Sequence, residues 1–364
     1  MKKMALSIYD AIDLAPADSS VKIVNHLNED EWKGFVEAHP EGNIFQTPEM
    51  FQVFKQTNRF QPDLWAAVSQ ERLLALFIPV HIRLFDHLPQ RFSTRSILYG
   101  SVLVSPDILG YQALGDLLDA YTNEVEEKPL FTELRNLYDF QLLNPVFVEH
   151  GFEYEDHLNF LIDLNKSPDE VFQSISSNGR KAIRKAMRKG VHAEEVHDRK
   201  LIPVFYDLLQ HTFTRAGVPL ADISLFEAVL DILVPDGKAK MFLANFEGRY
   251  IAASLELPYK DVIYSWFSGY DYEYRHLYPN DLLVWHALEW GAMNGYQVYD
   301  FGGAGRPDQE YGPRDFKAKF GGQLVNFGRY TYVHAPHTLT YSSFFYQIFR
   351  SVGIKTNLVR FFHH

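Results

Sequence analysis

Two charged side chains in the last third of the chain stand beside glycine-rich backbone, in a setting where a chemical site is expected. Asp300 lies in the segment YQVYDF and precedes Gly302 and Gly303, and Lys317 lies in the segment FKAKFGG. A cation in apolar surroundings stabilises the negative charge that develops on an attacked carbonyl oxygen. More than one interpretation of each side chain stays open. Asp300 is either a base, a group that orients a lysine or a backbone amide, or a structural cap of the turn. Lys317 either has a functional role or is a surface lysine with a buried stem.

The backbone that joins these residues is predicted to form a site loop. Residues 297–301 have the pattern of a β-strand, and the chain then breaks at the glycine pair and passes through a loop rich in glycine and proline. Glycine pairs permit backbone angles and close approaches that a Cβ forbids. A long polar loop between aromatic-rich anchors is more often a site than a plain connection. The candidate catalytic residues are Lys317, Phe316 and Asp300, and the backbone at Gly302 and Gly303 is expected to contact substrate.

The segment 176–190 predicts a strongly basic helix that begins at capping side chains and ends at Gly190. It contains six cations and no acid, with arginines four residues apart on one face and lysines beside them: Arg180, Arg184, Arg188, Lys181, Lys185 and Lys189. Like charges at this spacing cost stability. Either acids from elsewhere balance a solvated face, or the helix binds phosphate or nucleic acid. Arg180 and Arg184 are the candidate binding residues in the second case.

Residues 264–283 form an aromatic segment that predicts a strand, a loop and the start of a helix. In acyltransferases that use coenzyme A, a glycine-rich turn at such a junction offers backbone N–H groups to the pyrophosphate. Here no glycine occurs between Gly269 and Gly291, and bulky side chains fill the turn. The sequence therefore predicts no tight coenzyme A binding. The aromatic side chains either stack on a base or line a channel, or they pack in the core; the candidate substrate contacts are Tyr264, Trp266 and Tyr278.

Composition excludes several kinds of chemistry. The 364 residues include no cysteine, which rules out disulfides, thiolate metal sites and cysteine nucleophiles, and the 15 histidines show no metal-ligand spacing, so no metal site is expected. A formal charge of −11 argues against a surface that coats nucleic acid in general. No segment approaches the roughly 18 apolar residues of a membrane span, and Asp10 and Asp13 interrupt the apolar part of any signal peptide. These features favour a cytoplasmic globular protein.

At this length two domains are the default, and the order of predicted elements repeats. Helices are expected at 29–38, 47–56, 110–123, 201–216, 224–233 and 280–294. Strands are expected at 64–68, 73–80, 97–104, 131–137, 262–270 and 297–301, with a strand–turn–strand at 241–257 and two more strands within 147–164. We predict an α/β fold that contains two copies of one unit. The predicted division is a lead-in at 1–20, domains at 21–164 and 165–340, the second with the active site, and a tail helix at 341–364. The tail packs on the body or lies at a membrane interface.

Taken in order, several segments resemble the Fem family of bacterial aminoacyltransferases and the related FemAB-like members of the GNAT superfamily. These segments are IFQTPEMFQVFK, SSNGRKAIRKAMRKGV, the run from YSWFSGY to YDFGG, and GPRDFKAKFGG. The resemblance implies mixed sheets in two tandem GNAT-like domains facing across a cleft, which we expect Trp266, Tyr278, Phe316 and Lys317 to wall. Phe316 and Lys317 match the family's Phe-Lys pair, whose lysine supports the transition state. Lys55 lies near a lysine that contacts the nucleotide-sugar diphosphate.

The resemblance implies an acyl- or aminoacyltransferase that forms an amide on an amine of a cell-envelope precursor, such as a peptidoglycan-type peptide or an amino sugar. Aminoacyl-tRNA is the expected donor, with no bound cofactor, although the chain lacks the long coiled-coil insertion of some Fem enzymes. One alternative is an N-acyltransferase of polysaccharide or envelope biosynthesis that uses coenzyme A. Another is a non-catalytic module that binds a nucleotide-sugar or glycan-lipid. The expected partners are the envelope precursor, tRNA and, through the tail, a membrane surface.

Overall fold

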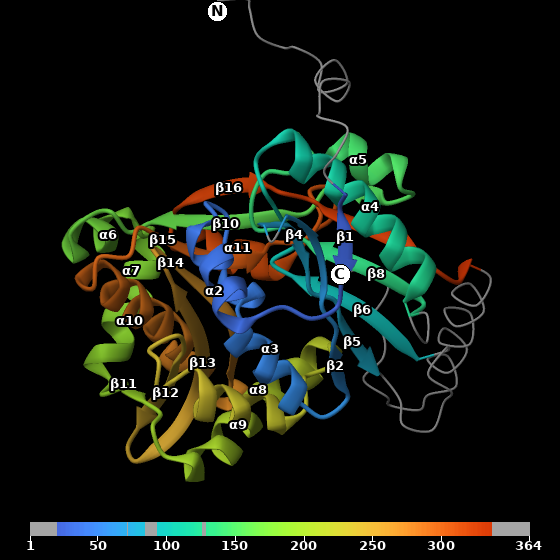
Figure 1. The fold of residues 1–364 in the computed structure, drawn as a ribbon. Helices are drawn as coiled ribbons and strands as arrows, with labels where there is room; N and C mark the ends of the chain where they lie inside the picture. Colours follow the sequence, from blue (N-terminus) through green and yellow to red (C-terminus); the bar gives the residue numbers. More distant parts are fainter. Residues whose placement is uncertain (1–19, 71, 84–92, 126–128, 337–364) are drawn as a thin grey trace, which may run out of the picture. The chain divides into compact units, whose positions relative to one another are not determined.

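The computed structural model describes residues 20–70, 72–83, 93–125 and 129–336 (Figure 1). The chain divides into two compact units, each of mixed α/β structure. Within the described ranges, the first unit comprises 20–51, 59–155 and 328–336, and the second comprises 52–58 and 156–327. The two units are described separately below.

The first unit contains two sheets. The smaller is antiparallel, in the order β1 (Lys22–Val24), β3 (Trp65–Ser69), β4 (Arg72–Phe77) and β7 (Leu103–Val104). The larger has the order β2 (Phe60–Pro62), β5 (Val80–Arg83), β6 (Thr94–Tyr99), β8 (Phe131–Arg135), β17 (Arg329–Val333) and β9 (Glu153–Glu155). Its strands pair antiparallel except β6 and β8, which are parallel.

A long helix, α4 (Ile108–Glu124), forms the core of the first unit. It begins at Asp107, whose side chain accepts a hydrogen bond from Gly110 N at 2.8 Å. Its apolar face packs against β3 and β4. Tyr121 on this face is fully buried, and its hydroxyl lies 2.7 Å from Thr132 Oγ1 and 3.1 Å from Ser96 Oγ. The shorter elements are α2 (Glu29–Ala38), η1 (Ile44–Gln46) and α5 (Asn144–Glu149), and α3 (Pro48–Gln56) begins in this unit and ends in the second.

The second unit is built on one seven-stranded sheet (Figure 1). Its order is β11 (His192–Glu195), β12 (Lys240–Phe246), β13 (Arg249–Tyr259), β14 (Val262–Tyr270), β15 (Val298–Gly303), β10 (Leu158–Asp163) and β16 (Gln323–Asn326). The helix α10 (Pro279–Met293) joins β14 to β15 and packs on the face that carries Phe242 and Tyr299, together with α6 (Pro168–Ser174) and α7 (Ser177–Arg188). The helix α8 (Ile202–Ala216) packs on β13 and β14, with α9 (Ile223–Ile232) beside it. The remaining short helices are η3 (Arg199–Leu201), η4 (Tyr272–Leu277) and α11 (Gly312–Ala318).

The centre of this sheet opens where β14 and β15 run parallel. Their pairing covers only Val262–Tyr264 on β14 and Val298–Asp300 on β15. On the other side of β14, Leu255 pairs with Phe267 and Glu256 pairs with Ser265, so Trp266 is an extra residue in a β-bulge. Bulges redirect side chains and end regular pairing. Within the described ranges, the end of β15 therefore lacks a partner on its β14 side only, because Gly303 still pairs with Asn159 on β10.

Many predicted elements agree with the structure in type and place, and some do not. The strand predicted at 262–270 and the helix predicted at 29–38 have the observed bounds. Two strands predicted within 147–164 were partly wrong, because Pro145 at the first turn starts the helix α5 and only then do β9 and β10 follow. The strands β2, β5, β11, β16 and β17, and the helices α6 and α11, had not been predicted as separate elements.

The predicted domain division at 164/165 differs from the compact units. The strand β10 pairs with β15 and β16, and therefore belongs to the sheet of the second unit. The strand β17 pairs with β8 and β9, and therefore belongs to the first unit although it lies near the end of the chain. Edge-to-edge pairing between distant segments is invisible to composition, so a single cut in the sequence could not reproduce it. The tail helix predicted at 341–364 and nearly all of the lead-in at 1–20 lie outside the described residues.

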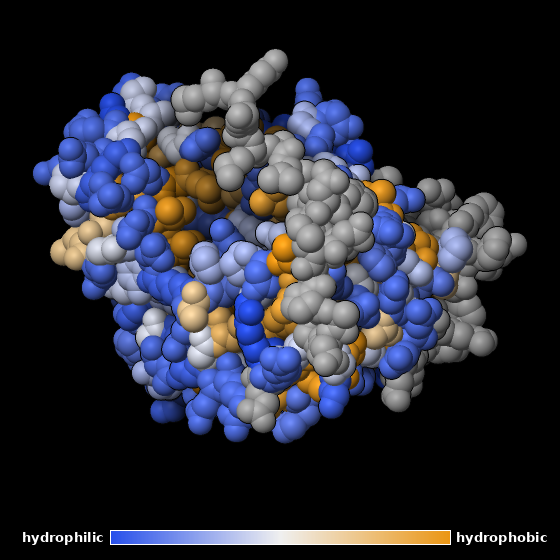
Figure 2. Space-filling model, turned by 45° about the horizontal axis from the view of Figure 1, so that its top comes forward, coloured by the Kyte–Doolittle hydropathy of each residue, from blue (hydrophilic) through white to orange (hydrophobic). Residues whose placement is uncertain are grey.

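The surface is mainly hydrophilic, with apolar side chains gathered in a hollow near the upper left of the view in Figure 2. Along the described ranges, every helix is too short or too polar to cross a membrane.

Candidate functional site

The ammonium group of Lys317 is bound at the end of β15. Lys317 lies on α11, and its Nζ donates to the carbonyl oxygens of Phe301 at 2.5 Å, Gly303 at 2.7 Å and Gly302 at 3.3 Å. An ammonium has three donors, so all three face backbone carbonyls. The bond to Gly302 O is the longest of the three. It is therefore the one that a substrate oxygen would most easily replace.

Asp300 holds the same backbone from the opposite side. It is 3% exposed, and its Oδ1 accepts from Gly302 N at 2.7 Å and from Asn159 Nδ2 at 3.4 Å. The Phe301 carbonyl and the Gly302 N–H belong to one peptide group, so Lys317 binds the oxygen of that group while Asp300 binds its N–H. A charge at each end polarises this peptide and fixes its orientation. The structure therefore brings Asp300, Lys317 and the glycine pair together, and their role as a site stays a prediction.

Both charged groups titrate away from their ordinary ranges. Burial lowers the pKa of Lys317 to about 8, although the charge of Asp300 opposes the change. Burial likewise raises the pKa of Asp300 to about 6, against the hydrogen bond from Gly302 N and the charge of Lys317. Groups with such values near neutral pH are typical of functional sites. Between about pH 6 and pH 8 the site holds a cation and an anion at once.

The turn at Gly302 needs glycine. Its φ is +68°, and a Cβ there would lie 3.1 Å from the Tyr264 hydroxyl oxygen. A side chain would strain the backbone and push on Tyr264, which pairs with Asp300 across the two parallel strands. Tyr264 and Gly302 are thus adjacent, in agreement with their prediction as members of one site.

The other predicted aromatic residues are placed separately. Phe316 precedes Lys317 on α11, and its ring packs against Phe320 at 5.3 Å between centroids. Trp266, at the β14 bulge, contacts Phe54 on α3 and its neighbour Phe267. That Trp266, Tyr278, Phe316 and Lys317 wall a common cleft stays a prediction.

Cations already occupy faces of the tyrosine rings in the η4 loop. Arg215 and Arg275 lie 4.6 Å and 4.3 Å from the Tyr272 ring centroid, and Arg249 lies 5.0 Å from that of Tyr274. Lys185 of α7 lies 4.8 Å from the Tyr278 ring centroid. The expected stacking of a base on these rings would have to share them with the cations. Tyr272, which is 49% exposed, is the ring with the most free surface in this set.

The start of α10 lacks a pyrophosphate cradle. Tyr278 precedes it in a left-handed conformation, Pro279 supplies no N–H, and η4 uses its own amides in short-range hydrogen bonds. Asp281 in the first turn is 5% exposed and forms an ion pair with Lys319 Nζ at 2.7 Å. A buried carboxylate at this point disfavours a bound anion. That the turn gives no tight binding of coenzyme A stays a prediction.

The predicted basic residues are on the surface of the second unit. Arg180 braces the turn between α6 and α7, because its guanidinium donates to Gln173 O at 2.7 Å and to Ile175 O. Arg184 is exposed and lies 5.1 Å from the Phe172 ring centroid. Lys55 is exposed near the end of α3, and no contact of its side chain with Lys317 or Asp300 is found within the described ranges.

One buried acid was missed by the sequence analysis. Glu256 on β13 is 1% exposed, and the Tyr299 hydroxyl donates to its Oε2 at 3.1 Å. Burial raises its pKa to about 7, against the hydrogen bonds that it accepts. A lone acid in the otherwise apolar segment IAASLEL was the available signal. Tyr299 directly precedes Asp300, so Glu256 contacts the strand that carries the site.

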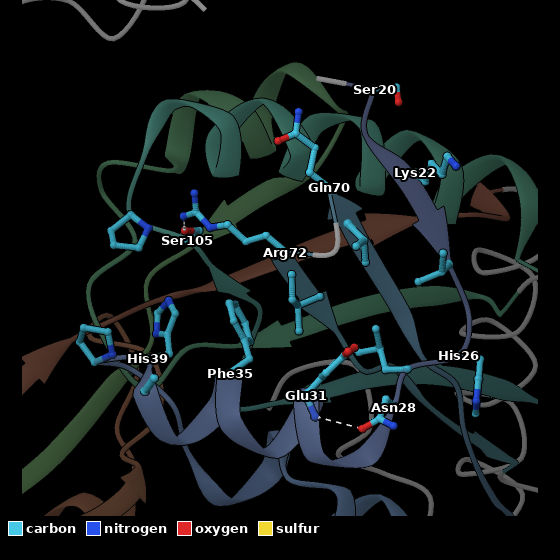
Figure 3. Close-up of a pocket in the computed structure, with 17 residues that line it drawn as sticks. Ser20, Lys22, His26, Asn28, Glu31, Phe35, His39, Gln70, Arg72 and Ser105 are labelled. Carbon is cyan, nitrogen blue, oxygen red and sulfur yellow. Dashed lines mark hydrogen bonds between the residues drawn. The ribbon is translucent and has the colours of Figure 1, made fainter. Parts of the chain in front are cut away.

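A separate hollow of about 1040 Å³ lies in the first unit, between α2 and the smaller sheet (Figure 3). Lys22, Gln70 and Arg72 lie on its strand side, and Glu31, Asn28 and His26 lie on the side of α2. Its size suits a small-molecule site, but none of the predicted site residues lines it. No motif marked it, because its lining comes from several short segments that only the fold brings together. Throughout the described ranges, no group of three or more His, Asp or Glu residues is arranged to hold a metal ion.

Comparison with known proteins supports the same class of fold. Residues 177–317 match the acetyltransferase (GNAT) domain family. This match contains β11 to β15, α10 and α11, and ends at Lys317. FemX has a similar structure, with a TM-score of 0.66 and 19% identity over 92% of this chain and 100% of that chain. A tandem GNAT protein from the clavulanic acid biosynthesis pathway is also similar, with a TM-score of 0.55 and 12% identity over 86% of this chain and 99% of its own.

In sequence, the chain is 25% identical over 240 residues to the lipid II:glycine glycyltransferase of Staphylococcus aureus (strain COL). The alignment covers 62% of this chain and 55% of the relative, so the chain spans about half the length of the curated relatives it matches. The fold is that of tandem GNAT proteins, as predicted. The sequence similarity to the lipid II:glycine glycyltransferase confirms the predicted resemblance to the Fem family.

Proposed function

We propose that the protein is an aminoacyltransferase that forms an amide on an amine of a cell-envelope precursor, with aminoacyl-tRNA as donor. The observation that carries this proposal is the Lys317 ammonium, held at the end of β15 with a pKa near 8. A cation at this point of the sheet suits a reaction in which negative charge develops on a carbonyl oxygen. The envelope precursor as acceptor is supported by the similarity to the lipid II:glycine glycyltransferase.

The proposed reaction needs no cofactor. The acceptor amine attacks the ester carbonyl of the donor, and the C–N bond forms as the carbonyl oxygen becomes negative. Lys317 stabilises this oxygen through the donor that now faces Gly302 O at 3.3 Å. The C–O bond to the donor's ribose then breaks, and one amine proton ends on the released hydroxyl. Asp300 acts as a positioning residue in this scheme, because its oxygen is already engaged by Gly302 N.

The choice of donor rests on the start of α10. A pyrophosphate at this position would lie near the buried Asp281 carboxylate and near Pro279, which has no N–H. Amides of the short helix η4 are already engaged in hydrogen bonds within that helix. The desolvation of the pyrophosphate would stay largely uncompensated. An aminoacyl ester makes no such demand on this turn. The GNAT family match favours an N-acyltransferase that uses coenzyme A as the second candidate.

Calorimetry and a transfer assay separate the candidates. We expect heat from an aminoacylated acceptor-stem RNA and none from micromolar acetyl-coenzyme A, and we expect amide formation on a peptidoglycan-type peptide that carries a free amine. Micromolar binding of acetyl-coenzyme A, with no heat from the RNA, would identify acyl-coenzyme A as the donor in place of aminoacyl-tRNA. Binding of a nucleotide-sugar or glycan-lipid with no transfer from either donor would identify a binding module instead.

A further inference from the structure

The helix α7 presents a cationic surface that this acidic protein leaves unbalanced. Its six cations are named above, and four of them, Lys181, Arg184, Arg188 and Lys189, are exposed. Considering the residues that the structure describes, no carboxylate oxygen lies within 4.0 Å of any of the six. Arg199, by contrast, has the acidic partners Asp231 and Glu227, whereas the exposed Arg215 and Arg275 lie over tyrosine rings. The first interpretation of this helix, a solvated face balanced by acids, therefore lacks its acids.

Without an anionic partner, the repulsion between the cations of α7 reduces the stability of the helix. Arginines and lysines repeat at four-residue spacing along α7, and such like-charge pairs destabilise a helix. The favourable interaction of cations with the helix dipole applies only to the last turn, where Lys185 and Arg188 lie. Cation–π contacts hold Arg184 against Phe172 and Lys185 against Tyr278, and they orient these side chains without neutralising them.

The position of α7 relates it to the candidate site. Ser176 N donates to Lys319 O at 2.8 Å, so the start of α7 adjoins the end of α11, two residues after Lys317. Gly179 is required at this junction, since a Cβ there would lie 3.2 Å from Lys319 O and 2.6 Å from an Ile175 side-chain carbon. A long anion bound along α7 would therefore have one end close to the helix that carries Lys317.

The chemistry of the exposed face indicates which anion. The apolar side of α7 is buried in the core and cannot insert into lipid. It consists of Ala182, Ile183 and Ala186. A helix that binds a membrane interface presents its apolar face to the lipid, whereas α7 exposes cations and a single large apolar side chain, Met187. A face on which exposed cations outnumber exposed apolar side chains suits a phosphodiester backbone.

We propose that α7 is the docking surface for the RNA of the donor, with Arg184, Arg188 and Lys189 contacting backbone phosphates of the acceptor arm while its aminoacyl end reaches Lys317. This inference rests on the proposed function and adds the surface by which the enzyme recognises RNA. Backbone contacts of this kind give affinity without sequence preference. In a protein with a net charge of −11, they also concentrate attraction for RNA at one place.

The test compares charge variants in binding and in transfer. The variants are R188E/K189E and the neutral R188Q/K189Q, and the matched control is K33E/K166E, which reverses two surface lysines on other elements. Binding of a fluorescent acceptor-stem hairpin RNA is measured by anisotropy across a salt titration. Each lost phosphate contact reduces the slope of log affinity against log salt by about 0.7–0.9. We expect R188E/K189E to weaken binding at least about tenfold at low salt and little at high salt, R188Q/K189Q to weaken it less, and the control to bind like the wild type.

Transfer measurements distinguish failure of this inference from failure of the proposed function. We expect the ratio of kcat/KM for the aminoacylated hairpin to that for an aminoacylated dinucleotide to fall in both α7 variants. If the wild type transfers from the hairpin and the variants match it in affinity, salt slope and this ratio, α7 is not the RNA surface and the proposed function stands. If the wild type neither binds the hairpin nor transfers from it, both proposals fail. If the α7 variants bound RNA like the wild type but lost binding to vesicles with anionic phospholipids, α7 would be a membrane surface and the inference would be overturned.

Discussion

Replacement of Lys317 by methionine should separate catalysis from stability. Lys317→Met keeps an unbranched apolar stem on α11 and removes the ammonium that binds Phe301 O, Gly302 O and Gly303 O. Loss of these bonds leaves three carbonyls without this donor, at a cost of about 1 kcal/mol each. Removal of the buried charge works in the opposite direction. Its pKa falls from 10.5 to about 8 on folding, which at about 1.4 kcal/mol per pH unit amounts to roughly 3 kcal/mol.

These two terms oppose each other and have similar size. We therefore expect the free energy of unfolding of the Lys317→Met variant at pH 7 to lie within about 1 kcal/mol of the wild type. The rate should respond differently, because loss of a single donor to a developing oxyanion lowers kcat by about 10²–10³. Urea unfolding gives the first quantity, and single-turnover transfer from an aminoacylated RNA gives the second.

The pH dependence supplies an internal check. A lysine whose folded pKa is lowered binds fewer protons in the folded state than in the unfolded state between about pH 8 and pH 10.5, so the wild type gains stability as pH rises through this window. The methionine variant has no group to titrate and should lack the gain. Lys166→Met, at an exposed lysine outside the site, is a control for removal of a lysine. A large loss of stability with kcat unchanged would refute the catalytic role and leave Lys317 as a structural brace of the glycine turn.

Three further predictions follow from neighbouring residues. The kcat/KM of the wild type should be bell-shaped with limbs near pH 6 and pH 8, and Asp300→Asn should remove the acid limb, since the Asp300 carboxyl must lose its proton to hold Gly302 N. Gly302→Ala should lower the free energy of unfolding by about 1–2 kcal/mol and reduce kcat, because the positive φ of Gly302 disfavours a side chain. Gly312→Ala should do neither, since a Cβ at Gly312 meets no atom within 4 Å. Equal effects of the two substitutions would show that the positive φ of Gly302 does not matter. Relative to the Glu256→Gln variant, the wild type should lose about 3 kcal/mol of unfolding free energy between pH 4.5 and pH 7. Burial in the folded protein raises the pKa of Glu256 to about 7, so the unfolded chain loses this proton at lower pH than the folded chain. If urea unfolding gave the same pH dependence of stability for both proteins, this prediction would be contradicted.

Local patterns predicted the parts of the site that depend on local sequence. The aromatic strand at 262–270 and the start of the strand before the glycine pair follow from alternation and β-propensity. The predicted break at the glycine pair was wrong, because β15 continues through Gly303, which pairs with Asn159 on β10. Asp300 and Lys317 were proposed as a catalytic pair because charge beside glycine in an aromatic setting is uncommon. That the turn before α10 binds no coenzyme A stays a prediction, to which the structure adds the buried Asp281.

Long-range contacts set the limits of that prediction. The three carbonyls around Lys317 become visible only when α11 is placed against the end of β15, and no spacing in the sequence encodes this. The exchange of β10 and β17 between the units depends on register between segments more than a hundred residues apart. Glu256 was missed because an isolated acid in a strand has no partner in the sequence, and its partner, Tyr299, lies on a strand two places away in the sheet.

The Lys317 ammonium and the Asp300 carboxylate do not form a direct ion pair, and their separation favours the proposed reaction. Considering all residues that the structure describes, no carboxylate oxygen lies within 4.0 Å of Lys317 Nζ, even though Asp300 is close enough to raise its pKa. A contact pair would neutralise the ammonium locally and leave little field for a substrate oxygen. Instead the peptide group between Phe301 and Gly302 separates the charges, with its oxygen on Lys317 and its N–H on Asp300. The anion thus keeps the lysine charged near neutral pH without occupying the donor that faces Gly302 O, and this donor is the one that the reaction needs.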